Sequence, residues 1–153
     1  MPDYLVSLLL IISCIMPVLP QKYQSRKAEI TTAFIEAVNK HVDQIMDGSA
    51  DHMYHIKDIA KLLFIHPVHL SNTIKLHTGK APCYFFEMRL MEEARKMLQM
   101  PQLSITEIAA KLTFDNSNFT KFFKRFEGVT PSQYRLQCAA TASSEVTLQV
   151  DGL

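Results

Sequence analysis

The sequence contains side chains that could ligate a metal or act in catalysis, but their spacing argues against both roles. His66 and His69 lie three residues apart, and His77 and Cys83 follow. This spacing is not that of a zinc finger, and no second cysteine lies nearby. We interpret His66 as a helix cap and Cys83 as a small buried residue. Because we find no Ser/His/Asp array, paired-carboxylate cleft or glycine-rich phosphate loop, we expect no metal, no other cofactor and no enzymatic activity.

Two short segments, residues 66–78 and 115–127, carry side chains suited to hydrogen bonding with base edges. In the first segment Leu70 and Ile74 lie four residues apart, so both face inward on a helix. The side chains that then face outward or flank this stripe are Val68, His69, Ser71, Asn72 and Lys75. Their counterparts in the second segment are Asn116, Ser117, Asn118, Thr120 and Lys121. In DNA recognition, side-chain amides pair with adenine, valine contacts the thymine methyl, and cations bind guanine or phosphate. The alternative interpretation of these residues is an ordinary solvated helix surface.

The two segments belong to an internal repeat with an offset of 49 residues and no gap. The matched positions are Ile56–Ala60 with Ile105–Ala109, Leu63 with Leu112, Leu70 with Phe119, Ile74–Lys75 with Phe123–Lys124, Gly79 with Gly128, and Pro82 with Pro131. Each copy predicts a helix, a short turn and a second helix. We therefore predict two helix-turn-helix units, over residues 55–79 and 104–128.

Capping signals place the ends of these helices. The expected start signals are Ser104 with Glu107, His55 with Asp58, His66 before Pro67, and Asp115. Gly79 and Gly128 end the second helix of each unit. The phenylalanines of the second unit (119, 122, 123 and 126) have helical spacing, which favours a core over a stacking surface for single strands.

Longer helices are predicted around the two units. A helix over residues 84–99 joins them and would span about 25 Å. This length is close to the ~34 Å that separates successive major-groove windows on one face of DNA. Residues 25–47 form an amphipathic helix with an apolar stripe that ends before Gly48. We expect an all-α fold of about seven helices, with two helix-turn-helix subdomains bridged by the long helix.

Composition and charge agree with a single intracellular domain. The chain has 153 residues, 48% of them hydrophobic, and three scattered cysteines, too few for a disulfide framework. The net charge is only +1, but residues 55–135 hold 12 Lys and Arg against 7 Asp and Glu. This basic excess directs attention to the repeat.

The two ends of the chain lie outside this domain, which we place at residues 25–135. Residues 1–24 form an apolar extension in which the run 4–19 is shorter than the ~20 residues that cross a bilayer as a helix. Export, membrane tethering and a packing arm remain alternatives for it, with the packing arm or a non-native start favoured. Residues 136–153 are small and polar, and we expect a flexible tail.

The repeat resembles the C-terminal DNA-binding domain of AraC/XylS-type bacterial transcription regulators, over roughly residues 30–135. The most diagnostic stretch is FTKFFKRFEGVTP at residues 119–131, which closes on Tyr134 and Arg135. The other matching positions are Ile59–Ala60, Leu70–Ser71, Lys75, Gly79, Arg89, Ala94, Leu98, Ser104–Ile105 and Ile108–Ala109.

Three departures from the family pattern stand out. Thr113 and Phe114 replace the usual Gly-Phe of the second turn, which would strain the backbone if position 113 needs a positive φ. That turn is also one residue shorter than is common. The first recognition helix has no arginine on its outer face. With only about 50 residues before the repeat, the chain resembles the short, single-domain members or a fragment of a longer regulator.

The resemblance implies sequence-specific binding to double-stranded promoter DNA by one monomer in the cytoplasm, with contact to RNA polymerase. The base-contacting residues would be Val68, Ser71, Asn72, Asn116, Ser117, Asn118, Thr120 and Lys121. The phosphate-contacting residues would be Lys75, Lys80, Lys124 and Arg125. For Arg89, Arg95 and Lys96 of the linker helix, ion pairs with its glutamates are the favoured role. The alternative function is a degenerate helix-turn-helix protein that acts as a protein-interaction or membrane-tethered module.

Overall fold

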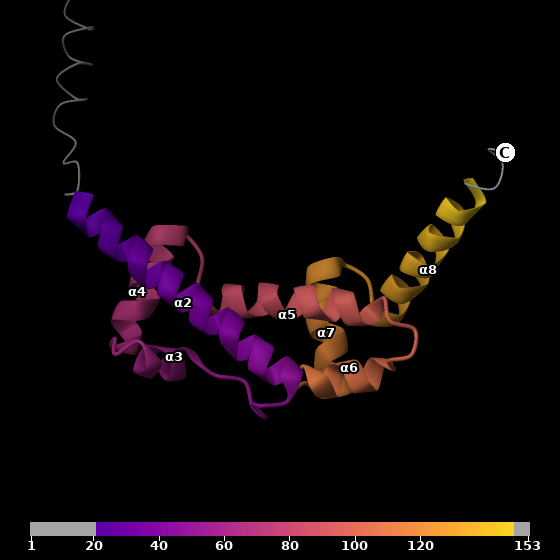
Figure 1. Ribbon diagram of the computed structural model, residues 1–153, viewed down its shortest axis with the longest axis horizontal. Coiled ribbons are helices and arrows are strands. Elements are labelled where there is room, and N and C mark those ends of the chain that lie inside the picture. The colour runs from indigo at the N-terminus through magenta and orange to yellow at the C-terminus, as the bar shows by residue number, and fades with distance from the viewer. Residues whose placement is uncertain (1–20, 149–153) are drawn as a thin grey trace, which may run out of the picture.

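Seven helices make up the part of the chain that the computed structural model describes, residues 21–148, with side chains from 25 to 141, and this part contains no strand. The helices are α2 (Gln21–Asp47), α3 (Ile56–Leu62), α4 (Pro67–Thr78), α5 (Pro82–Leu98), α6 (Ile105–Lys111), α7 (Asn116–Glu127) and α8 (Pro131–Leu148) (Figure 1). The predicted all-α fold with two helix-turn-helix units, α3–α4 and α6–α7, is confirmed.

The apolar side chains form two cores, one in each half of the molecule. The first core contains Phe34, Val38, Ile59, Ala60, Leu70, Ile74 and Phe86. The second core contains Val42, Leu90, Met91, Ala94, Met97, Leu98, Ile108, Ala109, Leu112, Phe119, Phe122 and Phe123. Helices α2 and α5 contribute to both cores, so these two helices together fix how one helix-turn-helix unit lies relative to the other.

A buried histidine attaches the end of α2 to the segment that precedes the first unit. The backbone N–H of Tyr54 donates to Nε2 of His41 over 2.9 Å, and the two rings stack with centroids 3.7 Å apart. Burial lowers the pKa of His41, which favours the neutral ring that can accept this hydrogen bond. This contact could not be predicted from the sequence, because a single histidine on an apolar helix face has no distinctive spacing.

The predicted caps are correct in position but differ in chemistry. Ser104 and Glu107 form the expected capping box, and the side chain of Asp115 accepts from the backbone N–H of Asn118. His55 and His66 occupy the N-cap positions of α3 and α4, yet neither side chain makes a cap hydrogen bond. The interpretation of His66 as the cap of α4, followed by Pro67 at the first helical position, is therefore confirmed in position, although its side chain donates and accepts no cap hydrogen bond.

Both helix-turn-helix turns contain a residue other than glycine in the left-handed region. The backbone φ is +55° at Phe64 and +62° at Thr113. In this region the side chain crowds the backbone, and a β-branched residue such as threonine is affected more than most. The strain expected from threonine in the second turn is therefore present.

Replacing Thr113 with glycine should stabilise the protein by about 1 kcal/mol, because glycine adopts a positive φ without steric cost. The matched control is Thr106→Gly within α6, where added backbone freedom should only destabilise. Denaturant unfolding of both variants measures the effect. An unfolding free energy that stays level or falls in Thr113→Gly would show that the turn accommodates threonine without strain.

Helix α8 corrects the expectation of a flexible tail for residues 136–148, which are helical. No glycine or proline interrupts residues 132–148, and alanines at 139, 140 and 142 favour helix. Arg135 Nε donates to the carbonyl oxygen of Leu98 over 3.1 Å, and the Tyr134 ring lies 5.3 Å from that of Phe123. These contacts attach the start of α8 to α5 and α7.

The apolar run at residues 4–19, and with it the hypotheses of export or tethering, lies outside the described residues. Among the helices that are described, none combines the length and the apolar character needed to cross a membrane.

Candidate nucleic-acid interface

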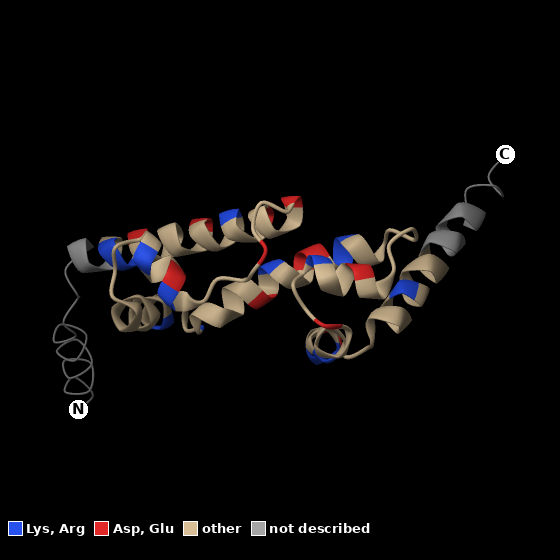
Figure 2. Cartoon of the chain, turned by 90° about the horizontal axis from the view of Figure 1, so that it is seen from below, with Lys and Arg blue, Asp and Glu red and all other residues tan. Residues whose placement is uncertain are grey.

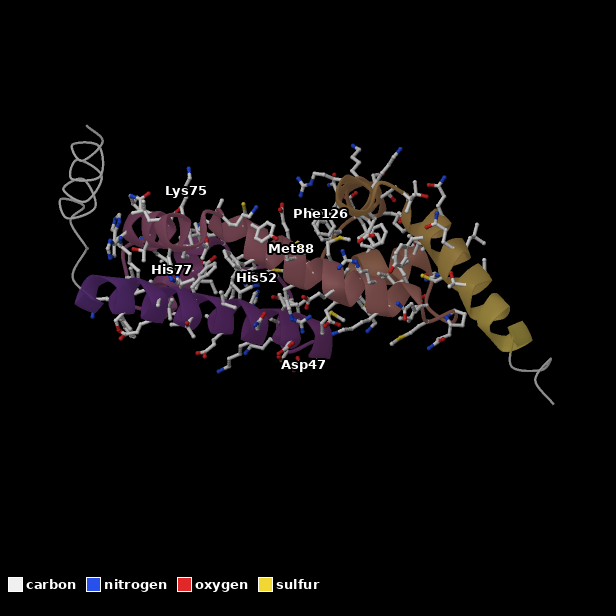
Figure 3. All side chains as sticks on the ribbon, turned by 90° about the horizontal axis from the view of Figure 1, so that it is seen from above. Asp47, His52, Lys75, His77, Met88 and Phe126 are labelled. Carbon is white, nitrogen blue, oxygen red and sulfur yellow. The ribbon has the colours of Figure 1, made fainter. Side chains whose placement is uncertain are left out.

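The second helices of the two units, α4 and α7, belong to the two different cores and lie on one side of the molecule. In Figure 1 both run roughly upright, with α5 crossing between them. Seen from above in Figure 3, Lys75 of α4 and Phe126 of α7 lie on one side of the molecule, and α2 with Asp47 lies on the other. The two helices can therefore contact one continuous partner.

Helix α4 has the inward and outward faces that its spacing predicted. Leu70 and Ile74 are fully buried, and Val68 is 61% exposed. Asn72 and Lys75 are also exposed. Ser71 differs, because it is half-buried and lines a groove of about 450 Å³ beside the start of α5. Cys83 lines the same groove and is exposed, so its interpretation as a buried residue is wrong.

Helix α7 places three of its five candidate base-contacting residues in solvent with unengaged side chains. Asn116, Ser117 and Lys121 are exposed and make no side-chain hydrogen bond or ion pair with a described residue. The amide of Asn118 donates to the carboxylate of Asp115. The hydroxyl of Thr120 donates to the carbonyl oxygen of Asn116 over 2.9 Å. The last two side chains must therefore exchange or share a hydrogen bond to contact a base.

The four candidate phosphate anchors fall into two groups. Lys75 and Lys124 are exposed and have no ion-pair partner within the described part of the chain. Lys80 lies over the ring of Tyr84, with Nζ 5.1 Å from the centroid. Arg125 donates from Nη2 to Oε1 of Glu87 over 2.7 Å. Two anchors are thus unrestrained, and two are held by neighbouring side chains.

The linker helix α5 carries ion pairs as predicted, but several of them reach other helices. Arg89 pairs with Glu93 within α5 and with Asp43 of α2 over 2.7 Å. Arg95 pairs with Glu127 of α7 over 2.5 Å. Partial burial would raise the pKa of Glu93, but hydrogen bonds from Arg89 and Lys96 outweigh it and hold the pKa below its ordinary value. Figure 2 shows the resulting mixture of basic and acidic residues along the long helices.

The histidines do not assemble into a cluster. Within residues 21–148, no group of three or more His, Cys, Asp or Glu side chains is arranged to hold a metal ion. Nδ1 of His77 instead lies 3.1 Å from the hydroxyl of Thr31 and joins α4 to α2.

Two helix-turn-helix units on one long helix define a DNA-binding domain of the double helix-turn-helix class. A family model described as a helix-turn-helix domain matches residues 59–137, more than half of the chain. The chain belongs to this family, in its AraC type.

Two curated relatives illustrate the similarity. The uncharacterized HTH-type transcriptional regulator YobQ of Bacillus subtilis is 35% identical over 81 residues, 52% of this chain and 34% of that protein. The HTH-type transcriptional activator AarP of Providencia stuartii is 28% identical over 119 residues, 77% of this chain and 85% of that protein. The chain therefore spans about a third of YobQ and most of AarP.

Solved structures share the architecture. The C-terminal domain of AraT, a response regulator from Geobacillus stearothermophilus, is 28% identical with a TM-score of 0.62, and the match covers 71% of this chain and 84% of that one. The DNA-binding domain of AdpA in complex with a target DNA has a TM-score of 0.57 at 18% identity, covering 75% of this chain and 94% of that one. The AdpA similarity establishes the fold alone.

Proposed function

We propose that this protein is a transcription regulator that binds specific sites in double-stranded promoter DNA, with α4 and α7 in successive major grooves. The observation that carries the proposal is the placement of two exposed polar and basic helix faces on one side of the molecule, with α4 directly before the start of α5 and α7 crossing α5 near Glu87 and Arg95. At ~1.5 Å per residue α5 is about 25 Å long, which suits two helices that enter adjacent windows of one duplex face.

Base contacts in this proposal come from the residues predicted from the sequence, in two groups. Val68, Asn72, Asn116, Ser117 and Lys121 are exposed and would contact base edges directly. Ser71, Asn118 and Thr120 would contribute after a change in their present hydrogen bonds or orientation. Lys75, Lys80, Lys124 and Arg125 would bind phosphates and fix the register.

Further parts of the proposal derive from the family. A single chain carries both recognition helices, so one monomer is sufficient for one site. Contact with RNA polymerase and a place in the cytoplasm follow from the role of a promoter-binding regulator. The domain that does this work would comprise residues 25–135, which include the start of α8, where Tyr134 packs against Phe123 of the second unit and Arg135 donates to the carbonyl oxygen of Leu98.

Binding to duplex DNA as a function of salt tests the proposal, with Lys124→Ala as the variant. Each phosphate contact releases a counterion, so removing one should reduce the slope of log affinity against log salt by ~0.9. Lys40→Ala is the matched control, because Lys40 is exposed on α2, a helix that carries none of the candidate DNA contacts.

The wild type should bind tightly at low salt and lose affinity steeply, which a protein-interaction module would not do. A slope that is the same in Lys124→Ala and in the wild type would remove Lys124 from the phosphate contacts. Failure of the wild type to bind duplex DNA at low salt would contradict the proposed function.

A further inference from the structure

We infer that Glu87 is a specificity-determining residue, which holds Arg125 of the second recognition helix in one orientation and weakens binding to DNA of unrelated sequence. This inference rests on the proposed function. It concerns an acidic residue of the linker helix that no motif of the DNA-contacting helices includes.

Arg125 is held by three groups at once. Its Nη2 donates to Oε1 of Glu87 over 2.7 Å, and its guanidinium carbon lies 4.9 Å from the ring centroid of Phe126 and 5.8 Å from that of Phe122. A carboxylate in the plane and a ring against the face fix both the position and the tilt of a guanidinium. The side chain is still 60% exposed, and Glu87 is its one hydrogen-bond partner among the described residues. The remaining donors are free for a phosphate or a base.

The position of Arg125 on α7 makes this orientation relevant to DNA. Arg125 follows Lys121 by four residues and Asn118 by seven, so the three side chains share one face of the helix. The restrained guanidinium therefore extends the proposed DNA-contacting surface by one turn. A restrained side chain loses less conformational entropy when it binds, which favours a partner that matches its orientation.

Glu87 stands between the contact surfaces of the two units. Through Arg125 it contacts α7, and its side chain lines the groove of about 450 Å³ that Ser71 of α4 also lines. A duplex that spans α4 and α7 brings its phosphates past this carboxylate. A negative charge there repels every phosphate backbone regardless of sequence.

These two effects have opposite consequences for matched and unmatched DNA. On a matched site the pre-oriented Arg125 offsets the repulsion, because its free donors meet their acceptor without reordering. On unrelated DNA the base contacts do not hold the protein in the register that aligns a phosphate with Arg125, so only the repulsion remains. Glu87 would thus increase the ratio of specific to non-specific affinity.

The test compares Glu87→Gln with the wild type on a selected site and on an unrelated duplex, between 50 and 200 mM salt. The amide keeps the shape and one acceptor but removes the charge. We expect unrelated DNA to bind about threefold or more tightly, with a salt slope steeper by up to ~0.9, and the affinity ratio to fall correspondingly. Glu92→Gln is the matched control, since Glu92 is exposed on α5 and lines a different groove, beside Ile35 and Asn39 of α2. Its ratio should not change.

Two further variants distinguish the orientation of Arg125 by Glu87 from the effect of the negative charge of Glu87 alone. Glu87→Asp should restore most of the wild-type ratio. Glu87→Gln should tighten binding to the selected site more in an Arg125→Ala background, where only the repulsion by Glu87 remains, than in the wild type. Unchanged or weaker binding of unrelated DNA by a folded Glu87→Gln, judged by its unfolding midpoint, would overturn the inference. An identical effect with and without Arg125 would overturn the holding role.

The wild type distinguishes failure of this inference from failure of the proposed function. If the wild type binds duplex DNA in a salt-dependent way, a failed result with the variants overturns this inference alone. If the wild type binds no duplex, the proposed function is overturned and this inference with it.

Discussion

Replacing Phe119 with alanine is expected to lower the free energy of unfolding by about 3–5 kcal/mol. Phe119 is fully buried in the second core, where its ring lies 6.0 Å from that of Phe123 and 6.3 Å from that of Phe114. The surrounding walls belong to α5, α6 and α7, which ion pairs and the second core hold together. Because such walls collapse poorly, most of the cavity should persist, and denaturant unfolding measures its cost.

The chain offers a matched control for this truncation. Phe64 is 97% exposed in the first turn, so Phe64→Ala deletes the same side-chain atoms as Phe119→Ala but at a solvent-exposed position. This control should change the free energy of unfolding by less than about 0.5 kcal/mol. A loss below about 1 kcal/mol for Phe119→Ala would mean that the buried and exposed faces of α7 are assigned the wrong way round.

Lys121→Ala should lower affinity for every DNA sequence, by about tenfold, whereas Asn72→Ala should relax preference at one base pair. Lys121 is an exposed cation on α7, and a cation attracts any phosphate backbone as well as donating to guanine. Asn72 is neutral, so its contribution of about 1–3 kcal/mol would depend on an adenine in the right place. We therefore expect the second unit to supply more affinity and the first to favour A·T-rich steps through Asn72 and Val68.

Affinities for a selected site and for its single-base variants measure this division between the two units. Asn39→Ala, an exposed asparagine on α2, is the control and should change neither affinity nor preference. The two relaxed base pairs should fall in different halves of the site. A preference profile that survives Asn72→Ala intact would show that α4 only positions the protein.

The architecture could be predicted from the sequence because local signals repeat in it. An offset of 49 residues aligns two helix-turn-helix units, and the apolar residues at helical spacing mark the faces that are buried. The same spacing predicts that Leu70 and Phe119 lie inward. Exposure of the flanking polar residues follows from geometry, so the candidate surface was largely predictable.

Contacts between helices distant in sequence could not be predicted in this way. The pairs Arg125–Glu87 and Arg95–Glu127 join residues 38 and 32 positions apart, and the partner of each depends on how α7 lies against α5. Ser71 is turned toward the groove beside α5 for the same reason. Small and polar composition also concealed α8, because alanine favours helix even where no apolar stripe marks a buried face.

Selection of bound sites from random duplex DNA tests the central claim most directly, which is that α4 and α7 contact successive major grooves of one site. The expected product is a pair of conserved blocks whose centres lie about one helical turn, ~10–10.5 base pairs, apart. Inserting half a turn between the blocks should then abolish the preference, because the two helices could no longer face their grooves together. Enrichment of a single block, or of two blocks whose spacing is freely variable, would contradict the account.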